Sequence, residues 1–220
     1  TEAVDNSTGD PVERGNVGAG TGTSVGKFHY QENGKAIAGM KAGIGSSRVD
    51  LGNGVIVCAL SVVNALGNII LPDGSILAGN RGGKDSRKYE TFEDFSKFLS
   101  NAKANTTISV VGLNVDLEIR ENYERVAHIA AQGHVRAINP VNTSLDGDTV
   151  FVFSNEEIKT FLTPLGDQIA KASWKNLRVD IISQVAAKAV QESIYDACKQ
   201  SKTVKLDGAY KGVIPSCNDY

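Results

Sequence analysis

The sequence predicts a layered α/β fold. Strand-like runs with period-two alternation lie in the middle of the chain, and segments with the 3.6-residue period of amphipathic helices lie between and after them. No internal repeat is present. A chain of 220 residues can bury a full core, and we expect residues 1–220 to form a single α/β domain.

Four elements are expected in the first half of the chain. The glycine-rich stretch 15–28 leads into a predicted strand at 27–31, and a second glycine turn covers 40–54. The apolar run 55–66 predicts a strand buried on both faces. Pro72-Asp73-Gly74 is a good turn sequence and predicts a hairpin within 67–83.

The second half is predicted from helix and strand periods. We expect a short capped helix at 91–102, a helix at 121–133 that ends on a glycine, and a long helix at 177–199. Strands are expected from Thr107 onward and over 148–153. One face of the first of these strands should carry Val111, Leu113, Val115, Leu117 and Ile119.

Charge and hydropathy exclude two classes of partner. The formal net charge is −2 and no block of five like charges occurs, which argues against a nucleic-acid partner. No run reaches the roughly 18 apolar residues of a membrane span, so no membrane partner is expected. The given residues contain no signal peptide, which favours the cytoplasm, although a chain that starts at Thr1 rather than Met leaves the compartment open.

Cysteines and histidines give no sign of a metal site. The three cysteines lack a C-x-x-C spacing and lie far from the three histidines, so we expect neither a metal nor another cofactor. Cys58 and Cys198 lie in apolar surroundings and are expected to be buried thiols. His128 and His134 are six residues apart at a predicted helix, where we expect them on the surface.

The glycine loop resembles a phosphate-binding loop but fails the pattern. In "GTGTSVGKF", Thr21 stands where G-x-x-x-x-G-K-[ST] needs its first glycine, and Phe28 stands where it needs a hydroxyl. A tight loop whose glycines allow close backbone packing is the better interpretation. Lys27 stays a candidate site residue because it directly follows this loop.

Two further segments contain candidate catalytic residues. Asp146 and Asp148 flank Gly147 before a strand, and this pattern is either turn chemistry or a carboxylate pair that orients a neighbouring amine or hydroxyl. Asn105-Thr106 lies at the start of a predicted apolar strand. A threonine at a chain start has a base of its own, because its α-amine titrates near ~8 and can accept the hydroxyl proton. Cleavage of the Asn105–Thr106 bond would create that amine.

Four blocks in order resemble one family. They are "GNVGAGTGTSVGK" (15–27), "VCALSVVNALGNI" (57–69), "NTTISVVGLNVDL" (105–117) and "ERVAHIAAQGHVRAINPVNTSLDGDTVF" (124–151). Together they resemble the DmpA-like self-processing L-aminopeptidase/D-amidase/esterases and the nylon-oligomer (6-aminohexanoate-oligomer) hydrolases, which are N-terminal-nucleophile enzymes.

The resemblance implies a role for each matching residue. Thr106 matches the nucleophile, released by self-cleavage after Asn105 into pieces 1–105 and 106–220. Asn64 matches an asparagine that helps to hold the oxyanion. Lys27 matches a lysine near the nucleophile. Asp146 and Asp148 match the acidic pair that orients it.

The resemblance also implies a fold, an activity and partners. The fold would be an αββα sandwich of the DmpA/ornithine acetyltransferase type, assembled into a homo-oligomer. The activity would be hydrolysis of amide bonds in small peptides, amino-acid amides or oligoamides through an acyl-Thr106 intermediate. Two alternatives stay open, namely a non-catalytic relative that serves as a binding or assembly module, and an acyl transferase that uses an amine acceptor.

One departure from the family stands out. Its members carry a substantial segment upstream of the glycine loop, with an active-site tyrosine, and nothing in the given residues corresponds to it. We expect this segment to have been removed, to be absent from this protein, or to exist as a separate piece that acts as a partner. The choice of amide substrate is therefore left open.

Overall fold

The computed structural model describes residues 5–28, 39–52, 54–82, 89–91, 105–159, 175–207 and 212–220. Its centre is a four-stranded sheet in the order β3-β4-β7-β9. These strands span Ile44–Asp50 (β3), Ile56–Asn64 (β4), Thr106–Val115 (β7) and Thr149–Ile158 (β9). All neighbours are antiparallel except β7 and β9, which are parallel.

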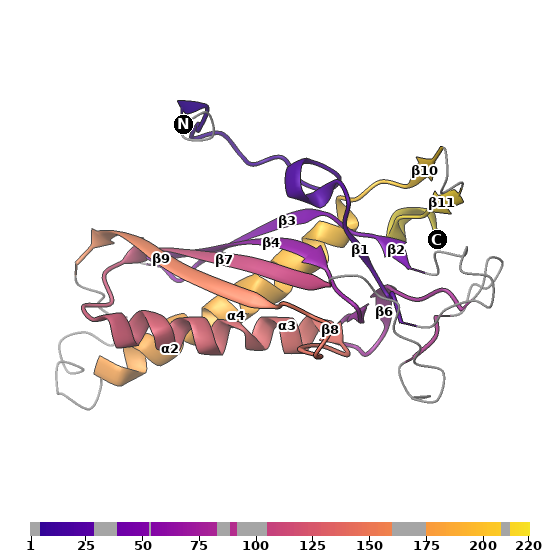
Figure 1. Ribbon diagram of the computed structural model, residues 1–220. Helices are drawn as coiled ribbons and strands as arrows, with labels where there is room; N and C mark the ends of the chain where they lie inside the picture. Colours follow the sequence, from indigo (N-terminus) through magenta and orange to yellow (C-terminus); the bar gives the residue numbers. More distant parts are fainter. Residues whose placement is uncertain are drawn as a thin grey trace.

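Three helices cover one face of this sheet (Figure 1). They are α2 (Arg120–Ala130), α3 (Gln132–Ala137) and α4 (Lys175–Lys199). The long C-terminal helix expected over 177–199 is confirmed as α4, with Ile182, Ala186 and Ile194 fully buried. The predicted layered α/β class is thereby confirmed.

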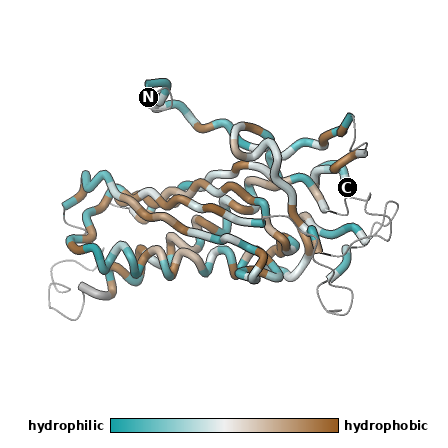
Figure 2. Tube along the Cα trace, in the orientation of Figure 1, coloured by the Kyte–Doolittle hydropathy of each residue, from teal (hydrophilic) through white to brown (hydrophobic). Residues whose placement is uncertain are grey.

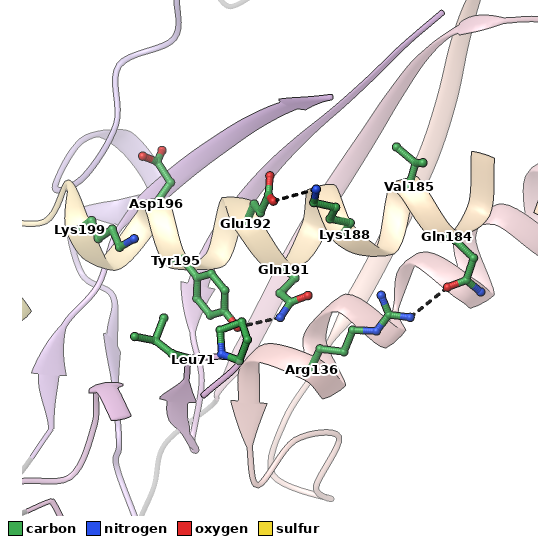
Figure 3. Close-up of a pocket in the computed structure, with 11 residues that line it drawn as sticks. Leu71, Arg136, Gln184, Val185, Lys188, Gln191, Glu192, Tyr195, Asp196 and Lys199 are labelled. Carbon is green, nitrogen blue, oxygen red and sulfur yellow. Dashed lines mark hydrogen bonds and ion pairs between the residues drawn. The ribbon is translucent and has the colours of Figure 1, made fainter. Parts of the chain in front are cut away.

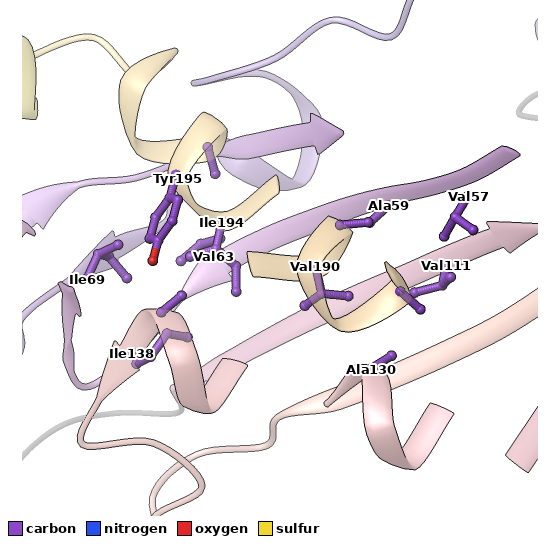
Figure 4. Packing of buried hydrophobic residues seen from close by; sticks show 14 of the residues in the cluster. Val57, Ala59, Val63, Ile69, Val111, Ala130, Ile138, Val190, Ile194 and Tyr195 are labelled. Atoms are coloured by element: carbon purple, nitrogen blue, oxygen red, sulfur yellow. The ribbon is translucent and has the colours of Figure 1, made fainter. Parts of the chain in front are cut away.

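The core lies between the sheet and the helices. Figure 4 shows Val57 and Val111 of the sheet facing Val190 and Ile194 of α4. Alternate residues of β7 point into this core because successive side chains of a strand lie on opposite faces. The expected buried face of β7 is confirmed from Val111 to Leu117, but Ile119 is 53% exposed because it lies at the start of α2.

The opposite face of the sheet is less covered than the sequence suggested. β4 alternates between buried and half-buried positions, so the expectation of burial on both faces is wrong among the described residues. Phe151 and Phe153 of β9 are each 57% exposed on the face away from the helices. Figure 2 shows the hydrophobic positions spread along β4, β7 and β9.

The second glycine turn expected over 40–54 is mostly extended. It forms β2 (Met40–Lys41) and β3, and among its described residues the turn lies near Gly52, where Val55 N–H donates to the Gly52 carbonyl over 3.2 Å. Gly45 lies in β3 beneath α4, where a Cβ would come within 2.1 Å of the Ser193 carbonyl oxygen. This glycine therefore serves close helix–sheet packing rather than a turn.

The strand expected at 27–31 is wrong at residues 27 and 28, which lie in no strand. β1 (Ser24–Val25) pairs with β2, and Lys27 follows it; residues 29–31 lie outside the described residues. The 3-10 helix η1 (Gly18–Gly20) precedes β1 within the glycine loop. The helix expected at 91–102 also lies outside the described residues, except for Thr91.

Two small sheets complete the described structure. The predicted hairpin is confirmed as β5 (Asn68–Ile70) and β6 (Ile76–Ala78), with Gly74 in the turn at φ 84°. β8 (Ile138–Asn139) pairs with β5. β10 (Val204–Leu206) and β11 (Gly212–Ile214) form a second pair, followed by the 3-10 helix η5 (Cys217–Asp219).

The helix expected at 121–133 does not end at its glycine. α2 and α3 follow each other across Ala131, and Gly133 lies inside α3, where a Cβ would come within 2.5 Å of the Ala187 carbonyl oxygen. Gly133 therefore permits α3 to pack closely against α4.

His134 is buried, which corrects the expectation of a surface position. Its Nε2 lies 2.8 Å from Ser109 Oγ, and Ser109 Oγ lies 2.7 Å from Ser61 Oγ. His128 is exposed, as expected. Of the two thiols, Cys198 is buried as expected, but Cys58 is only half-buried because it lies on the outer face of β4.

Candidate active site

The expected nucleophile and oxyanion residue meet at one edge of the sheet. Asn64 is the last residue of β4 and Thr106 is the first of β7, and the two are paired in the antiparallel ladder. β4 includes most of the block 57–69 that resembles the family, and it ends at Asn64. Both side chains are therefore placed by the register of two central strands.

The glycine loop brings Lys27 to the same edge. Gly26 N–H and Lys27 N–H donate to the Gly67 and Leu66 carbonyls, each over 2.8 Å, so the loop is docked on the chain just after β4. Gly26 has φ 68°, and a Cβ there would meet Asn80 N at 2.1 Å. Only glycine fits this position, directly before the candidate lysine.

Lys27 and Asn64 are joined by two hydrogen bonds. The ammonium donates to Asn64 Oδ1 over 2.7 Å and to the Asn64 carbonyl over 2.8 Å. Ser24 N–H also donates to Asn64 Oδ1, over 3.2 Å, which fixes the amide with Nδ2 on the side away from Lys27. Burial lowers the pKa of Lys27 to about 8, an effect that the negative charge of Asp146 partly opposes.

The turn from Asp146 to Asp148 lies alongside the Asn105–Thr106 bond. Asn105 forms a parallel bridge with Asp146. Asp146 accepts hydrogen bonds from Thr143 Oγ1 over 2.6 Å and from Leu66 N–H over 3.2 Å. These contacts tie the turn both to its own start and to the chain after β4.

Asp148 holds the backbone on the other side of the nucleophile. It accepts Thr107 N–H over 2.6 Å and Asn142 N–H over 3.2 Å. Burial raises the pKa of Asp148, and the negative charge of Asp146 raises it further, while the two N–H donors act against the increase.

The Thr106 hydroxyl donates to a backbone group. It donates to the Gly147 carbonyl over 2.7 Å, and the carboxylates of Asp146 and Asp148, on either side of that glycine, accept the Thr143 hydroxyl and the Thr107 N–H. The side chains of Asp146 and Asp148 thus bind groups next to Thr106 rather than the Thr106 hydroxyl itself. The structure brings together all of Lys27, Asn64, Asn105, Thr106, Asp146 and Asp148.

Sequence reasoning missed three supporting residues. Ser24 orients Asn64 through its backbone, and Thr143 binds Asp146 three residues before it, a local pattern that the sequence does display. Lys41 is 2% exposed and donates to the carbonyls of Gly20, Thr23 and Ala42 over 2.7–2.8 Å. A buried ammonium that binds loop carbonyls holds the glycine loop in place, and no local sequence signal predicts it.

A groove lies on the molecule away from these candidate residues. It has a volume of about 910 Å³ and is formed by α4, Arg136 of α3 and the turn at Leu71 and Pro72 (Figure 3). None of the expected site residues line it. Within the described ranges, no group of three or more His, Cys, Asp or Glu could hold a metal ion, and no helix has the length and hydropathy to cross a membrane.

The fold is that of the N-terminal-nucleophile aminopeptidases. The L-aminopeptidase D-Ala-esterase/amidase of Ochrobactrum anthropi, described as a variant of the Ntn hydrolase fold, superposes with a TM-score of 0.60 at 18% identity, over 98% of this chain and 52% of that one. The model of peptidase family S58 matches residues 1–210. The chain therefore belongs to peptidase family S58, and the resemblance found in the sequence is confirmed.

Curated relatives agree with this membership. An uncharacterized aminopeptidase of Mycobacterium leprae is 32% identical over 158 residues, which cover 69% of this chain and 40% of the relative. A 6-aminohexanoate-oligomer endohydrolase of Paenarthrobacter ureafaciens is 27% identical over 192 residues, which cover 84% of this chain and 51% of the relative. The chain thus matches about half the length of these relatives.

Proposed function

We propose that this chain is the core of a self-processing amidohydrolase that cleaves amide bonds through Thr106. One observation carries the proposal, namely that Thr106, Asn64 and Lys27 converge on one edge of the sheet beside the Asn105–Thr106 bond. An unrelated scaffold has no need for that set of groups at one place. Membership of a peptidase family supports the same chemistry.

The first step is cleavage of the chain after Asn105. It converts Thr106 into a residue whose own α-amine lies next to its hydroxyl. In its neutral form this amine accepts the hydroxyl proton while Oγ1 bonds to the substrate carbonyl carbon. The substrate C–N bond then breaks, the proton passes to the departing amine, and an acyl-Thr106 ester is left. Water then hydrolyses the ester and regenerates the enzyme.

Asn64 and Lys27 serve the charge that develops during attack. The bonds to Asn64 Oδ1 direct the Nδ2 donor of that amide to the other side, where it is proposed to hold the oxyanion. The Lys27 ammonium adds a positive charge close by. Asp146 and Asp148 keep the turn beside Thr106 in place.

The names of the relatives support a substrate class. They are those of an uncharacterized aminopeptidase and of a 6-aminohexanoate-oligomer endohydrolase. We propose peptides, amino-acid amides or oligoamides as substrates. A homo-oligomer, and a separate upstream piece that completes the pocket, are proposed as partners.

Hydrolysis of amino-acid p-nitroanilides and of short 6-aminohexanoate oligomers by the purified chain tests the proposal. Thr106→Ala should abolish turnover, and Thr106→Ser, which keeps a hydroxyl, should retain part of it. Thr8→Ala removes an exposed threonine hydroxyl in the N-terminal segment and serves as the control. A Thr106→Ala variant that is as active as the control would overturn the assignment.

A further inference from the structure

A single residue contacts both sides of the bond that we propose is cut. Gly147 N–H donates to the Asn105 carbonyl oxygen over 2.9 Å. The Gly147 carbonyl accepts the Thr106 hydroxyl over 2.7 Å. The carbonyl to be attacked and the attacking hydroxyl are thus both held by one glycine.

This glycine is itself fixed from several directions. Asp146 N–H donates to the Thr143 carbonyl over 2.9 Å, and the Asp146 carboxylate binds the Thr143 hydroxyl. The Asp148 carboxylate binds the Thr107 and Asn142 N–H groups. The Gly147 N–H therefore has a set direction before the reaction begins, which is what makes an oxyanion donor effective.

Asn105 is also held against the turn. Its N–H donates to the Leu145 carbonyl over 3.3 Å, and the residue is 3% exposed. With Asn105 anchored on one side and Thr107 N–H on the other, the intervening peptide bond has little freedom to move away from Gly147.

We propose that the Gly147 N–H is the oxyanion donor of self-cleavage, and that the Gly147 carbonyl orients the Thr106 hydroxyl. The inference rests on the proposed function, because it concerns the step that activates the site. It separates this donor from Asn64, whose side chain is proposed to serve substrate turnover.

Self-cleavage proceeds by transfer of the Asn105 acyl group from nitrogen to oxygen, followed by hydrolysis. Thr106 Oγ1 bonds to the Asn105 carbonyl carbon, and the carbonyl electron pair moves onto the oxygen that faces Gly147 N–H. The C–N bond then breaks, and the hydroxyl proton reaches the departing Thr106 nitrogen through water, which leaves an ester and a free amine. A second water hydrolyses the ester to the Asn105 carboxylic acid and the Thr106 hydroxyl.

Gly147 permits a test that changes its N–H alone. Cell-free translation of the full chain with nonsense suppression can place glycolic acid at position 147. This replacement exchanges the Gly147 N–H for an ester oxygen and keeps the carbonyl that binds Thr106. Glycine loaded at the same codon is the matched control. The intact mass over time gives the rate of cleavage for each chain.

Loss of one oxyanion donor should slow cleavage by roughly 10²–10³-fold. Equal rates for the glycolate and glycine chains would overturn this inference and leave the proposed function standing. A glycine control that is never cut would instead overturn the proposed function.

Gly147→Ala supplies a second variant that does not depend on the ester chain folding. Its φ is outside the left-handed region, and an added Cβ would lie 3.4 Å from Thr106 Oγ1, an ordinary contact, so the variant keeps the N–H and fits. Cleavage within about tenfold of wild type supports the N–H as the active feature. A loss as large as that of the ester chain would overturn it in favour of turn shape.

Discussion

Asn64 and Thr106 face each other as the final pair of the β4–β7 ladder. This pairing places the proposed nucleophile opposite the residue proposed to hold the oxyanion. Because neighbouring strands in a ladder are rigid, the separation between the two residues is set by the sheet and not by a loop. Lys27 reaches the pair from the glycine loop through its bonds to Asn64.

The lysine predicts how activity depends on pH. Because burial lowers the pKa of Lys27 to about 8, this residue is mainly ammonium at pH 7 and loses its charge as the pH rises through 8. The amide hydrolysis rate should therefore fall on the alkaline side. Lys27→Met should remove this alkaline limb and lower kcat/KM by about 10²-fold. An alkaline limb that persists in Lys27→Met would assign the pKa to another group.

The buried carboxylate predicts a pH-dependent stability. Because burial raises the pKa of Asp148 above 3.8, ionising it costs more in the folded state than in the unfolded one. Stability of the wild type relative to Asp148→Asn should thus decrease as the pH rises through the raised pKa. Urea unfolding at a series of pH values measures this difference. Identical pH profiles for the two proteins would contradict it.

The same variant should be cut more slowly. An amide at position 148 keeps one acceptor for Thr107 N–H but turns a donor toward Asn142 N–H, so the turn beside Thr106 loses a partner. We expect self-cleavage to slow by about tenfold or more, as judged from the cost of an unsatisfied buried donor. Asp10→Asn changes an exposed carboxylate and serves as the control.

Two glycines of one loop predict opposite outcomes. Gly26→Ala would place a Cβ 2.1 Å from Asn80 N at a positive φ, so the chain must move directly before Lys27. We expect a loss of about 2 kcal/mol in unfolding free energy together with reduced turnover. Gly22 has open space around it, and Gly22→Ala should leave both quantities nearly unchanged. Thermal unfolding and turnover rates of both variants test this prediction. Equal losses in Gly26→Ala and Gly22→Ala would contradict the close docking of the loop at Gly26.

The buried lysine predicts a stability loss away from the catalytic groups. Lys41→Met removes the buried ammonium that donates to the carbonyls of Gly20, Thr23 and Ala42, although Gly20 still accepts the Thr23 hydroxyl and Thr23 still accepts Ala42 N–H. We expect a loss of about 2 kcal/mol in unfolding free energy, the scale of losing hydrogen bonds from a charged group. Lys205→Met, at an exposed position, should cost about 0.5 kcal/mol or less. If Lys41→Met unfolds at the same denaturant concentration as Lys205→Met, the proposed clamp on the loop is wrong.

Much of the fold could be predicted because the apolar residues of its central elements recur with a regular period. The alternation in β7 and the helical stripe of α4 are long and are decided by burial on one side. β3 was missed because its sequence, IGSSRVD, is small and polar, and its glycine is explained only by the helix that lies on it. Gly133 was wrongly predicted to end a helix for the same reason, because Ala187, against which it packs, is distant in the sequence.

The candidate site depended on resemblance more than on periodicity. Lys27, Asn64 and the two aspartates come from separate segments, and no local pattern links them. The contacts of Gly147 were not predicted, because backbone donors and acceptors leave no trace in a sequence. The burial of His134 was also missed, because its partner Ser109 lies 25 residues earlier on a different layer.

The most direct test of the central claim is the denatured intact mass of the purified chain, combined with N-terminal sequencing. Self-processing should give two pieces whose masses sum to that of the whole chain plus one water, with the second piece starting at Thr106. A single uncut mass in a folded sample that has been incubated to completion would contradict self-processing at Asn105–Thr106.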